Sequence, residues 1–238
     1  MSRAKLWVFV AFAVLAAAVF VRLGVWQLDR LHQRRAQNAL IVSRLDSAVV
    51  DPRGLPPDTA IARFRRVRVA GVPDYAHELI YATRTRLGSP GVNFLTPVRL
   101  AGTDTAVIVN RGWVYSPDGS TVDEAKWHDR DSVFVGYAEE MPSRGGATFT
   151  SRPNVIARLS YDVVRKALPY PVAPIYVVAL AGADSTVAPD RIARLTIPPL
   201  DEGPHFSYAI QWFGFAAVAL VGAGFVIRQS RARGAANA

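Results

Sequence analysis

Two long apolar segments, one near each end, constrain this chain more than any other feature of its sequence. Residues 6–28 contain a single charged residue, Arg22, and residues 206–227 contain none. As α-helices, which rise about 1.5 Å per residue, these segments measure roughly 33–35 Å and can cross a hydrocarbon core of about 30 Å. We therefore expect two transmembrane helices, residues 6–28 and 205–227, that flank a domain of residues 29–204.

The first apolar segment has a second interpretation, as a cleaved signal peptide. The three alanines at residues 16–18 satisfy the small-residue rule for a cleavage site. Apolar sequence nevertheless continues beyond them through Val25 and Trp26, which favours a helix that is retained in the mature protein.

The distribution of charge predicts how the two helices are oriented. All 19 acidic residues lie between Asp29 and Glu202 together with 22 of the 28 basic residues, so the middle is nearly neutral although the chain carries +9. The tails, residues 1–5 and 228–238, are basic and contain no acid. Because basic tails mark the cytoplasmic side, both termini are expected there, in a plasma-membrane protein whose central domain is extracytoplasmic. This distribution also argues against a nucleic-acid partner.

The middle of the chain is expected to be a mainly antiparallel β-domain, either a sheet or a partly closed barrel, which gives a membrane-anchored α+β fold. Residues 28–45 keep a helical period and continue the first helix, and residues 51–58 (DPRGLPPD) read as a linker. The β-branched runs that follow predict strands at 66–72, 78–84, 92–100, 105–114, 132–139 and 174–180, with a further short strand at 191–197. Residues 160–168 predict a short helix with Ser160 as its N-cap.

Several classes of activity are excluded by what the sequence lacks. Cysteine is absent, which removes disulfide scaffolds, cysteine-based zinc sites and covalent c-type haem attachment. The chain has no nucleophile elbow, phosphate-binding loop, dinucleotide fingerprint or zinc-protease helix motif. The sequence therefore carries no catalytic signature. The acidic residues around His128 are interpreted as a solvated turn in preference to a metal site.

His205 is the histidine with the most distinctive surroundings, because it opens the run HFSYAIQWF at the edge of the second apolar segment. On a helix, His205, Tyr208 and Trp212 share one face. An imidazole can ligate haem iron while aromatic rings cover the macrocycle. The residues by themselves nevertheless favour a plainer interpretation, in which His205 caps the helix and the aromatic residues belong to an interfacial belt.

The predicted topology brings a second segment beside this one. The end of the first helix and the start of the second emerge on the same membrane face, so residues 22–30 (RLGVWQLDR) and 205–213 should lie side by side. Trp26 and Arg30, four residues apart, would present an aromatic ring and a cation there. The guanidinium would suit either a carboxylate or a lipid phosphate.

Five motifs, in this order, resemble the Surfeit locus protein 1 family of cytochrome c oxidase assembly factors. They are LGVWQLDR (23–30), FRRVRVAGVPDY (64–75), TPVRL (96–100), VNRGWV (109–114) and HFSYAIQWFGFA (205–216). The resemblance covers nearly the whole chain and is weakest over residues 119–201. Its most specific motifs are VNRGWV and the histidine-containing segment.

The resemblance implies non-enzymatic help in building a haem–copper oxidase, with haem a bound at the outer membrane face and presented to the catalytic subunit. It implies His205 as the axial iron ligand, and Trp26 and Gln27 as further cofactor-binding residues. Tyr208 and Trp212 would line the macrocycle. The implied partners are the oxidase catalytic subunit, a haem a synthase and membrane lipid.

Two other functions stay open at this point. The chain could be an assembly scaffold that binds no cofactor, in which His205 is structural. It could also be a membrane-anchored binding module that is unrelated to the oxidase.

Overall fold

The computed structural model describes residues 3–128, 131–143, 148–149, 152–181 and 191–235. The chain divides into two compact units, one of residues 1–40 with 199–238 and one of residues 41–198. The first unit is a pair of helices and the second is a β-rich domain.

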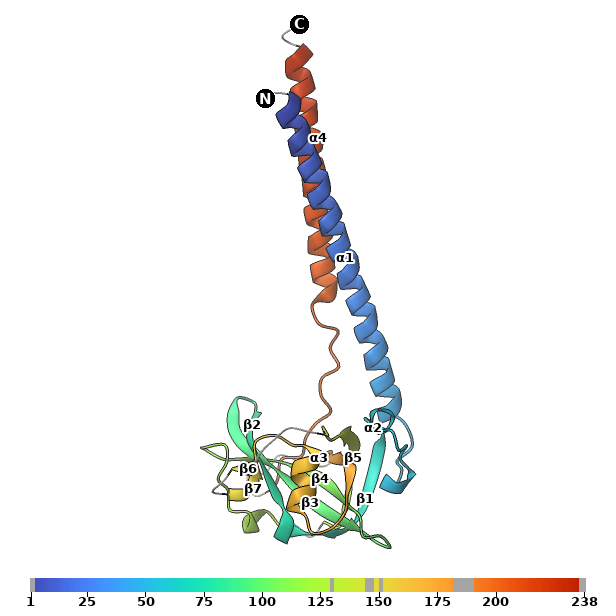
Figure 1. The fold of residues 1–238 in the computed structure, drawn as a ribbon, viewed down its shortest axis with the longest axis vertical. Helices are drawn as coiled ribbons and strands as arrows, with labels where there is room; N and C mark the ends of the chain where they lie inside the picture. The colour runs from blue at the N-terminus through green and yellow to red at the C-terminus, as the bar shows by residue number, and fades with distance from the viewer. Residues whose placement is uncertain (1–2, 129–130, 144–147, 150–151, 182–190, 236–238) are drawn as a thin grey trace. The chain divides into compact units, whose positions relative to one another are not determined.

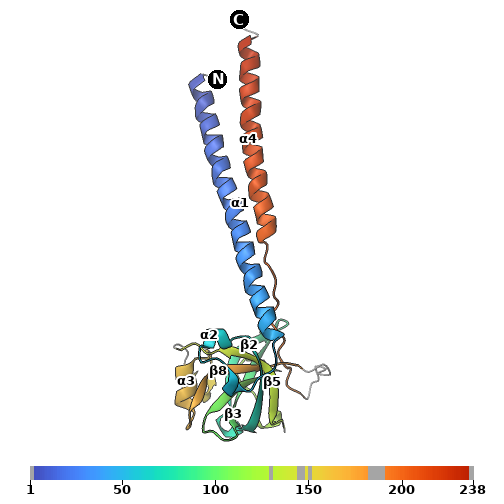
Figure 2. The same cartoon turned by 90° about the vertical axis from the view of Figure 1, so that its right-hand side faces the viewer.

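The helix pair consists of α1 (Arg3–Leu45) and α4 (His205–Ala235). Both are long enough and apolar enough to cross a membrane, and α1 continues well beyond the apolar segment, as the helical period of residues 28–45 predicts. Figures 1 and 2 show the two helices side by side and antiparallel, with the start of α1 and the end of α4 at the same end of the pair.

Small residues allow these helices to approach each other closely. Ala209, Ala216 and Ala223 recur every seven residues along α4 and are all buried, as are Ala13 and Ala17 of α1. A seven-residue spacing keeps side chains on one face of a helix, and small side chains there bring two backbones together.

In the residues that the structure describes, the β-rich domain forms one sheet of eight strands, two of which are short and lie at its edge beyond β2. The main strands are β1 (Arg66–Pro73), β2 (Leu79–Arg86), β3 (Ser89–Leu100), β4 (Ala106–Tyr115), β5 (Val133–Glu140) and β8 (Val172–Ala179). The two short edge strands are β6 (Thr148–Phe149) and β7 (Arg152–Ile156). Short helices α2 (Thr59–Ala62) and α3 (Tyr161–Ala167) complete the domain, and three 3-10 turns, η1 (Pro52–Gly54), η2 (Tyr75–His77) and η3 (Ala125–Trp127), lie in its loops.

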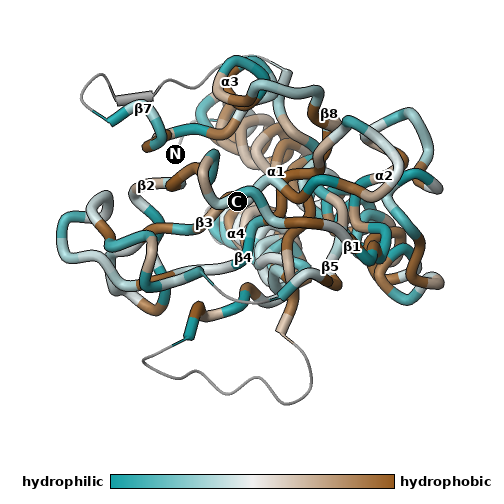
Figure 3. Tube along the Cα trace, turned by 90° about the horizontal axis from the view of Figure 1, so that it is seen from below, coloured by the Kyte–Doolittle hydropathy of each residue, from teal (hydrophilic) through white to brown (hydrophobic). Residues whose placement is uncertain are grey.

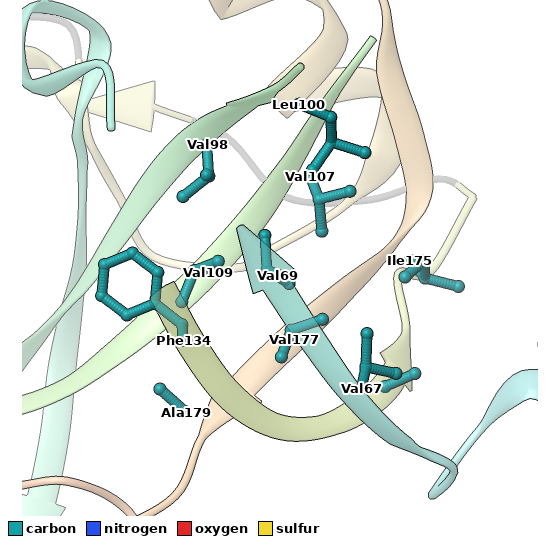
Figure 4. Packing of buried hydrophobic residues seen from close by; sticks show 11 residues of the cluster. Val67, Val69, Val98, Leu100, Val107, Val109, Phe134, Ile175, Val177 and Ala179 are labelled. Atoms are coloured by element: carbon teal, nitrogen blue, oxygen red, sulfur yellow. The ribbon is translucent and has the colours of Figure 1, made fainter. Parts of the chain in front are cut away.

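Five strands close on themselves into a barrel. They hydrogen-bond in the order β1-β5-β8-β4-β3. The barrel closes because residues 98–100 of β3 pair with β1. Residues 89–95 of β3 pair instead with β2, which carries β7 and β6 outward. Each of the five barrel strands contributes buried side chains to the interior (Figure 4); these include Val67, Val69, Val98, Leu100, Val107, Val109, Phe134, Ile175, Val177 and Ala179. In Figure 3 hydrophobic colours follow stretches of several strands, and hydrophilic colours are frequent in the loops.

The sheet is mixed, which the prediction of a mainly antiparallel domain captures only in part. Six strand pairs are antiparallel, but β4 and β8 are parallel, as are β2 and β7. The chain leaves the sheet after β5, passes through β6, β7 and α3, and inserts β8 between β5 and β4. A strand pattern shows where a strand lies and which of its faces is buried. It does not show whether the strand runs parallel or antiparallel to its neighbours, because both kinds of pairing can bury that face.

The residue ranges of the six long strands and of α3 agree with prediction to within three residues, and Ser160 is the N-cap of α3. Residues 191–197 were wrongly predicted as a strand. In the structure they make only isolated bridges, Trp113 with Ala193 and Leu180 with Leu195. β6, β7 and α2 were not predicted, because each is too short to show a period.

Candidate functional site

His205, the first residue of α4, is joined to α1 by a hydrogen bond. Its Nδ1 lies 2.9 Å from Oε1 of Gln27, a residue 178 positions earlier in the chain. Gln27 is only 9% exposed, and it lies on the same face of α1 as Gly24 and Leu31, which are also buried. Two of the residues that the sequence and the family resemblance single out are therefore in direct contact.

Close packing one turn away supports this contact. A Cβ placed on Gly24 would lie 2.7 Å from the ring of Phe213, so the aromatic ring fills the space that a side chain at Gly24 would need. Further along the pair, Phe20 stacks on Trp212 with ring centroids 5.8 Å apart. Trp212 therefore packs within the helix pair, seven residues and about 10.5 Å of helix axis away from His205.

The two other predicted site residues are open to the surroundings. Trp26 is 48% exposed and Tyr208 is 45% exposed. Trp26 adjoins Gln27 in sequence, and Tyr208 lies one turn beyond His205. Each therefore presents a large part of its ring at about the level of the hydrogen bond between Gln27 and His205.

A polar cleft of about 300 Å³ adjoins His205 on the side of the residues that precede α4. Its lining consists of Arg30, Gln33, Arg34 and Gln37 of α1 together with Asp201, Glu202, Gly203 and His205. Arg34 donates to the backbone oxygen of Asp201 at 3.1 Å, and Arg35 forms a two-bond ion pair with Glu202 at 2.8 Å. These contacts tie the approach to α4 to α1. The same ion pair lowers the pKa of the Glu202 carboxyl below its ordinary value.

The position of Gly203 leaves space beside the other nitrogen of His205. An ideal Cβ at Gly203 would lie 3.5 Å from both Cδ2 and Nε2 of the imidazole. Gly203 has a φ of +69°, a conformation that favours glycine. The backbone N–H of Gly203 donates to Oδ1 of Asp201 at 3.0 Å, which holds this turn.

A second unusual site lies within the β-rich domain, at Arg111 of the VNRGWV motif. Across the β3–β4 pair, Phe94 opposes Gly112 and Leu95 opposes Asn110, so Arg111 is the extra residue of a β-bulge. Its side chain is fully buried and forms an ion pair with Glu78 at 2.6 Å. The guanidinium also donates to the hydroxyl of Thr96 at 2.6 Å and to the backbone oxygen of Trp127 at 2.8 Å.

Aromatic rings surround this buried ion pair. The Arg111 guanidinium lies 5.0 Å from the ring centre of Tyr75 and 5.3 Å from that of Phe94. Tyr75 stacks in turn on His128, whose Nε2 is 4.0 Å from Oε2 of Glu78. Burial raises the pKa of the Glu78 carboxyl above its ordinary value, and the Arg111 charge opposes part of that rise. We interpret this group as structural, since Arg111 joins β4, the start of β2 and η3.

Two of the acidic residues near His128, Asp131 and Glu124, have partners elsewhere. Asp131 pairs with Arg194 at 2.9 Å, and Glu124 accepts a hydrogen bond from Asn154 at 2.8 Å. Asp129 lies outside the described residues. In the part of the chain that the structure describes, no group of three potential ligands could hold a metal ion.

Sequence reasoning missed several residues of both sites. Glu78, at the entry to β2, reads as an ordinary polar residue bounding a strand, and Thr96 as a β-former. Gly203 gave a weak signal, since a glycine just before a predicted helix reads only as a loop residue. No local pattern reveals that Glu78 and Thr96 meet Arg111, because these residues lie 33 and 15 positions away from it in the sequence. Gly203 is only two residues from His205, but the sequence does not show how the turn between them places it against the imidazole.

Comparison with known proteins agrees with the family resemblance of the motifs. The model of the SURF1 family matches residues 14–217. An uncharacterized SURF1-like protein of Mycobacterium tuberculosis (strain ATCC 25618 / H37Rv) is 29% identical over 241 residues, which cover 95% of this chain and 86% of the relative. SURF1-like proteins of Monosiga brevicollis and Rickettsia bellii (strain RML369-C) are each 25% identical, covering 83% and 92% of this chain and 79% and 88% of the relatives.

Proposed function

The chain belongs to the SURF1 family, whose members are in general cytochrome oxidase assembly factors and not enzymes, and on that premise we propose that it binds haem a as its cargo. It holds the haem at the outer face of the plasma membrane and presents it to the catalytic subunit of a haem–copper oxidase. Family membership supports this proposal over the alternative of a binding module unrelated to the oxidase.

The hydrogen bond between Gln27 and His205 is the observation that carries this proposal. It engages Nδ1 of the imidazole, and neutral imidazole ligates haem iron through the nitrogen that remains. The space that a Cβ at Gly203 would fill lies on that remaining side. The donor set and the open space therefore fit a haem iron as cargo of this helix pair.

The other residues of the helix pair have supporting roles in the proposal. Trp26 and Tyr208, each about half exposed, offer flat apolar surface to the macrocycle. Trp212, stacked on Phe20, braces the helices from within the pair. A single axial histidine suits a carrier, because the cargo has to be released to the oxidase. The β-rich domain is proposed to recognise the catalytic subunit or a haem a synthase.

The proposed topology places both tails in the cytoplasm and the β-rich domain outside it. Two observations support it: both helices are apolar enough to span a membrane, and each short tail is basic. Because two spans return the chain to its starting side, the domain between them must lie on the opposite side.

Single cysteines test this topology directly, since the natural chain has none. Leu87→Cys, at a position that is 97% exposed in the turn between β2 and β3, should react with a membrane-impermeant maleimide in intact spheroplasts. Arg231→Cys should react only after lysis, and the cysteine-free chain sets the background. Labelling of Arg231→Cys before lysis would contradict the proposed orientation.

Haem binding is tested by purifying the full chain in detergent from a host that makes haem a. We expect the protein to carry a Soret absorption band, and His205→Ala to reduce that band to background, because the axial ligand is lost. His32→Ala, which changes an exposed histidine of α1, is the matched control and should keep the band.

The outcomes distinguish a carrier from a cofactor-free scaffold. A Soret band that His205→Ala leaves unchanged refutes the ligand assignment. If the wild-type chain carries no band while deletion of its gene still lowers the amount of assembled oxidase, the scaffold is the correct function.

A further inference from the structure

We propose that Gln27 is a positioning residue that fixes the proton of His205 on Nδ1, and that Gly203 keeps the Nε2 side clear, so that Nε2 is prepared to ligate a metal. The inference rests on the proposed function and deepens it. It also changes the role of Gln27, which the family resemblance gives as a residue that binds the cofactor itself.

The first step is the direction of the hydrogen bond. Nδ1 of His205 lies 2.9 Å from Oε1 of Gln27. The Gln27 amide is oriented with its oxygen toward the ring, and a carboxamide oxygen only accepts hydrogen bonds, so this orientation assigns the donor role and the proton to Nδ1. A neutral imidazole has one N–H group, and its lone pair is then on Nε2, the nitrogen that faces away from Gln27.

The second step is that the glutamine side of the bond is buried, while His205 itself is partly buried. Gln27 is 9% exposed, and its neighbours on the inner face, Gly24 and Leu31, are buried as well. On the partner helix, Ala209 is 1% exposed one turn beyond His205. Burial of Gln27 strengthens its hydrogen bond to the imidazole relative to one in water.

The third step concerns Gly203. Since its φ is +69° and its amide is held by Asp201 at 3.0 Å, the turn directs the Cα of this residue toward the imidazole. A Cβ there would lie 3.5 Å from Nε2, an ordinary contact that causes no clash. Steric exclusion of a side chain is therefore not the reason for glycine at this position. Its consequence is that the space next to Nε2 stays open.

The location of the proton can be measured without any haem. The full chain is prepared in detergent with ¹⁵N in its histidine rings, and nitrogen–proton correlation spectra distinguish the two neutral tautomers. Only four histidines are present, and the signals that vanish in His205→Ala identify His205. We expect the wild type to carry its proton on Nδ1, and Gln27→Leu to move it to Nε2, the tautomer that free histidine prefers in water.

Conservative and distant variants separate this role from a merely structural one. Gln27→Glu should keep the proton on Nδ1, because a carboxylate oxygen also accepts hydrogen bonds. Gln211→Leu, which removes an exposed glutamine from α4, should leave the spectrum of His205 unchanged. Gly203→Ala should also leave the proton on Nδ1.

Titration with hemin as the probe then measures the consequence for binding. Loss of a partner that orients a metal ligand typically weakens affinity by about 10–100-fold, which is the effect expected of Gln27→Leu. Gln27→Glu should restore most of the affinity. Gly203→Ala should weaken binding although the tautomer is unchanged, since its methyl group occupies the space beside Nε2.

Failure of this inference can be distinguished from failure of the proposed function. A wild-type proton on Nε2, or a Gln27→Leu spectrum like that of the wild type, overturns the inference alone if hemin still binds through His205. If the tautomers are as expected but hemin does not bind, the proposed function is wrong. The role of Nε2 as a ligand is then wrong as well.

Discussion

Arg111→Met is expected to destabilise the β-rich domain by about 3–5 kcal/mol, the usual cost of removing one partner of a buried ion pair. The reason is the charge that stays behind. Glu78 has a fully buried side chain, and its Oε1 accepts from Arg111 while Oε2 has no hydrogen-bond partner in the described structure. Without the guanidinium, the carboxylate would remain in an apolar environment uncompensated, or it would have to take up a proton.

The measurement is urea unfolding of the full chain in detergent, with near-ultraviolet circular dichroism as the signal that monitors unfolding. Arg68→Met removes an exposed arginine from strand β1 and should change the free energy of unfolding by about 0.5 kcal/mol or less. Adding Glu78→Leu to Arg111→Met should recover part of the loss, because the stranded charge is then gone. A double variant that is no more stable than Arg111→Met would contradict this explanation.

Gly112→Ala is expected to destabilise the same domain through two separate costs. Gly112 has a φ of +128°, and forcing an L-residue into such a conformation costs about 1–3 kcal/mol. A Cβ would also lie 2.4 Å from the backbone oxygen of Ala193. That backbone cannot move without breaking the reciprocal hydrogen bonds between Trp113 and Ala193, at 2.8 and 2.9 Å, and overpacking of this kind costs about 1–3 kcal/mol more.

Gly102→Ala separates the two costs. Gly102 has a φ of +75°, and nothing lies within 4 Å of an ideal Cβ at this position. It should therefore show only the conformational cost in the same unfolding experiment. Equal losses of stability in the two variants would show that the contact with Ala193 contributes nothing.

The sequence by itself determined the two apolar helices, the six long strands and α3, because each depends on a local pattern. The apolar composition of segments 6–28 and 206–227 predicts the two long helices, and runs of β-branched residues predict the strands. The motif order also gave the family, and it singled out Gln27 and His205 as site residues. It could not show that these two side chains are bonded to each other.

Only the tertiary structure decided how these elements are joined. Closure of the barrel through residues 98–100, the parallel placement of β8 beside β4 and the bulge at Arg111 depend on pairings between distant residues. The same is true of the partner of Arg111, since Glu78 lies 33 positions away. Local periodicity reports which face of an element is apolar, whereas register and partner choice follow from packing of the whole chain.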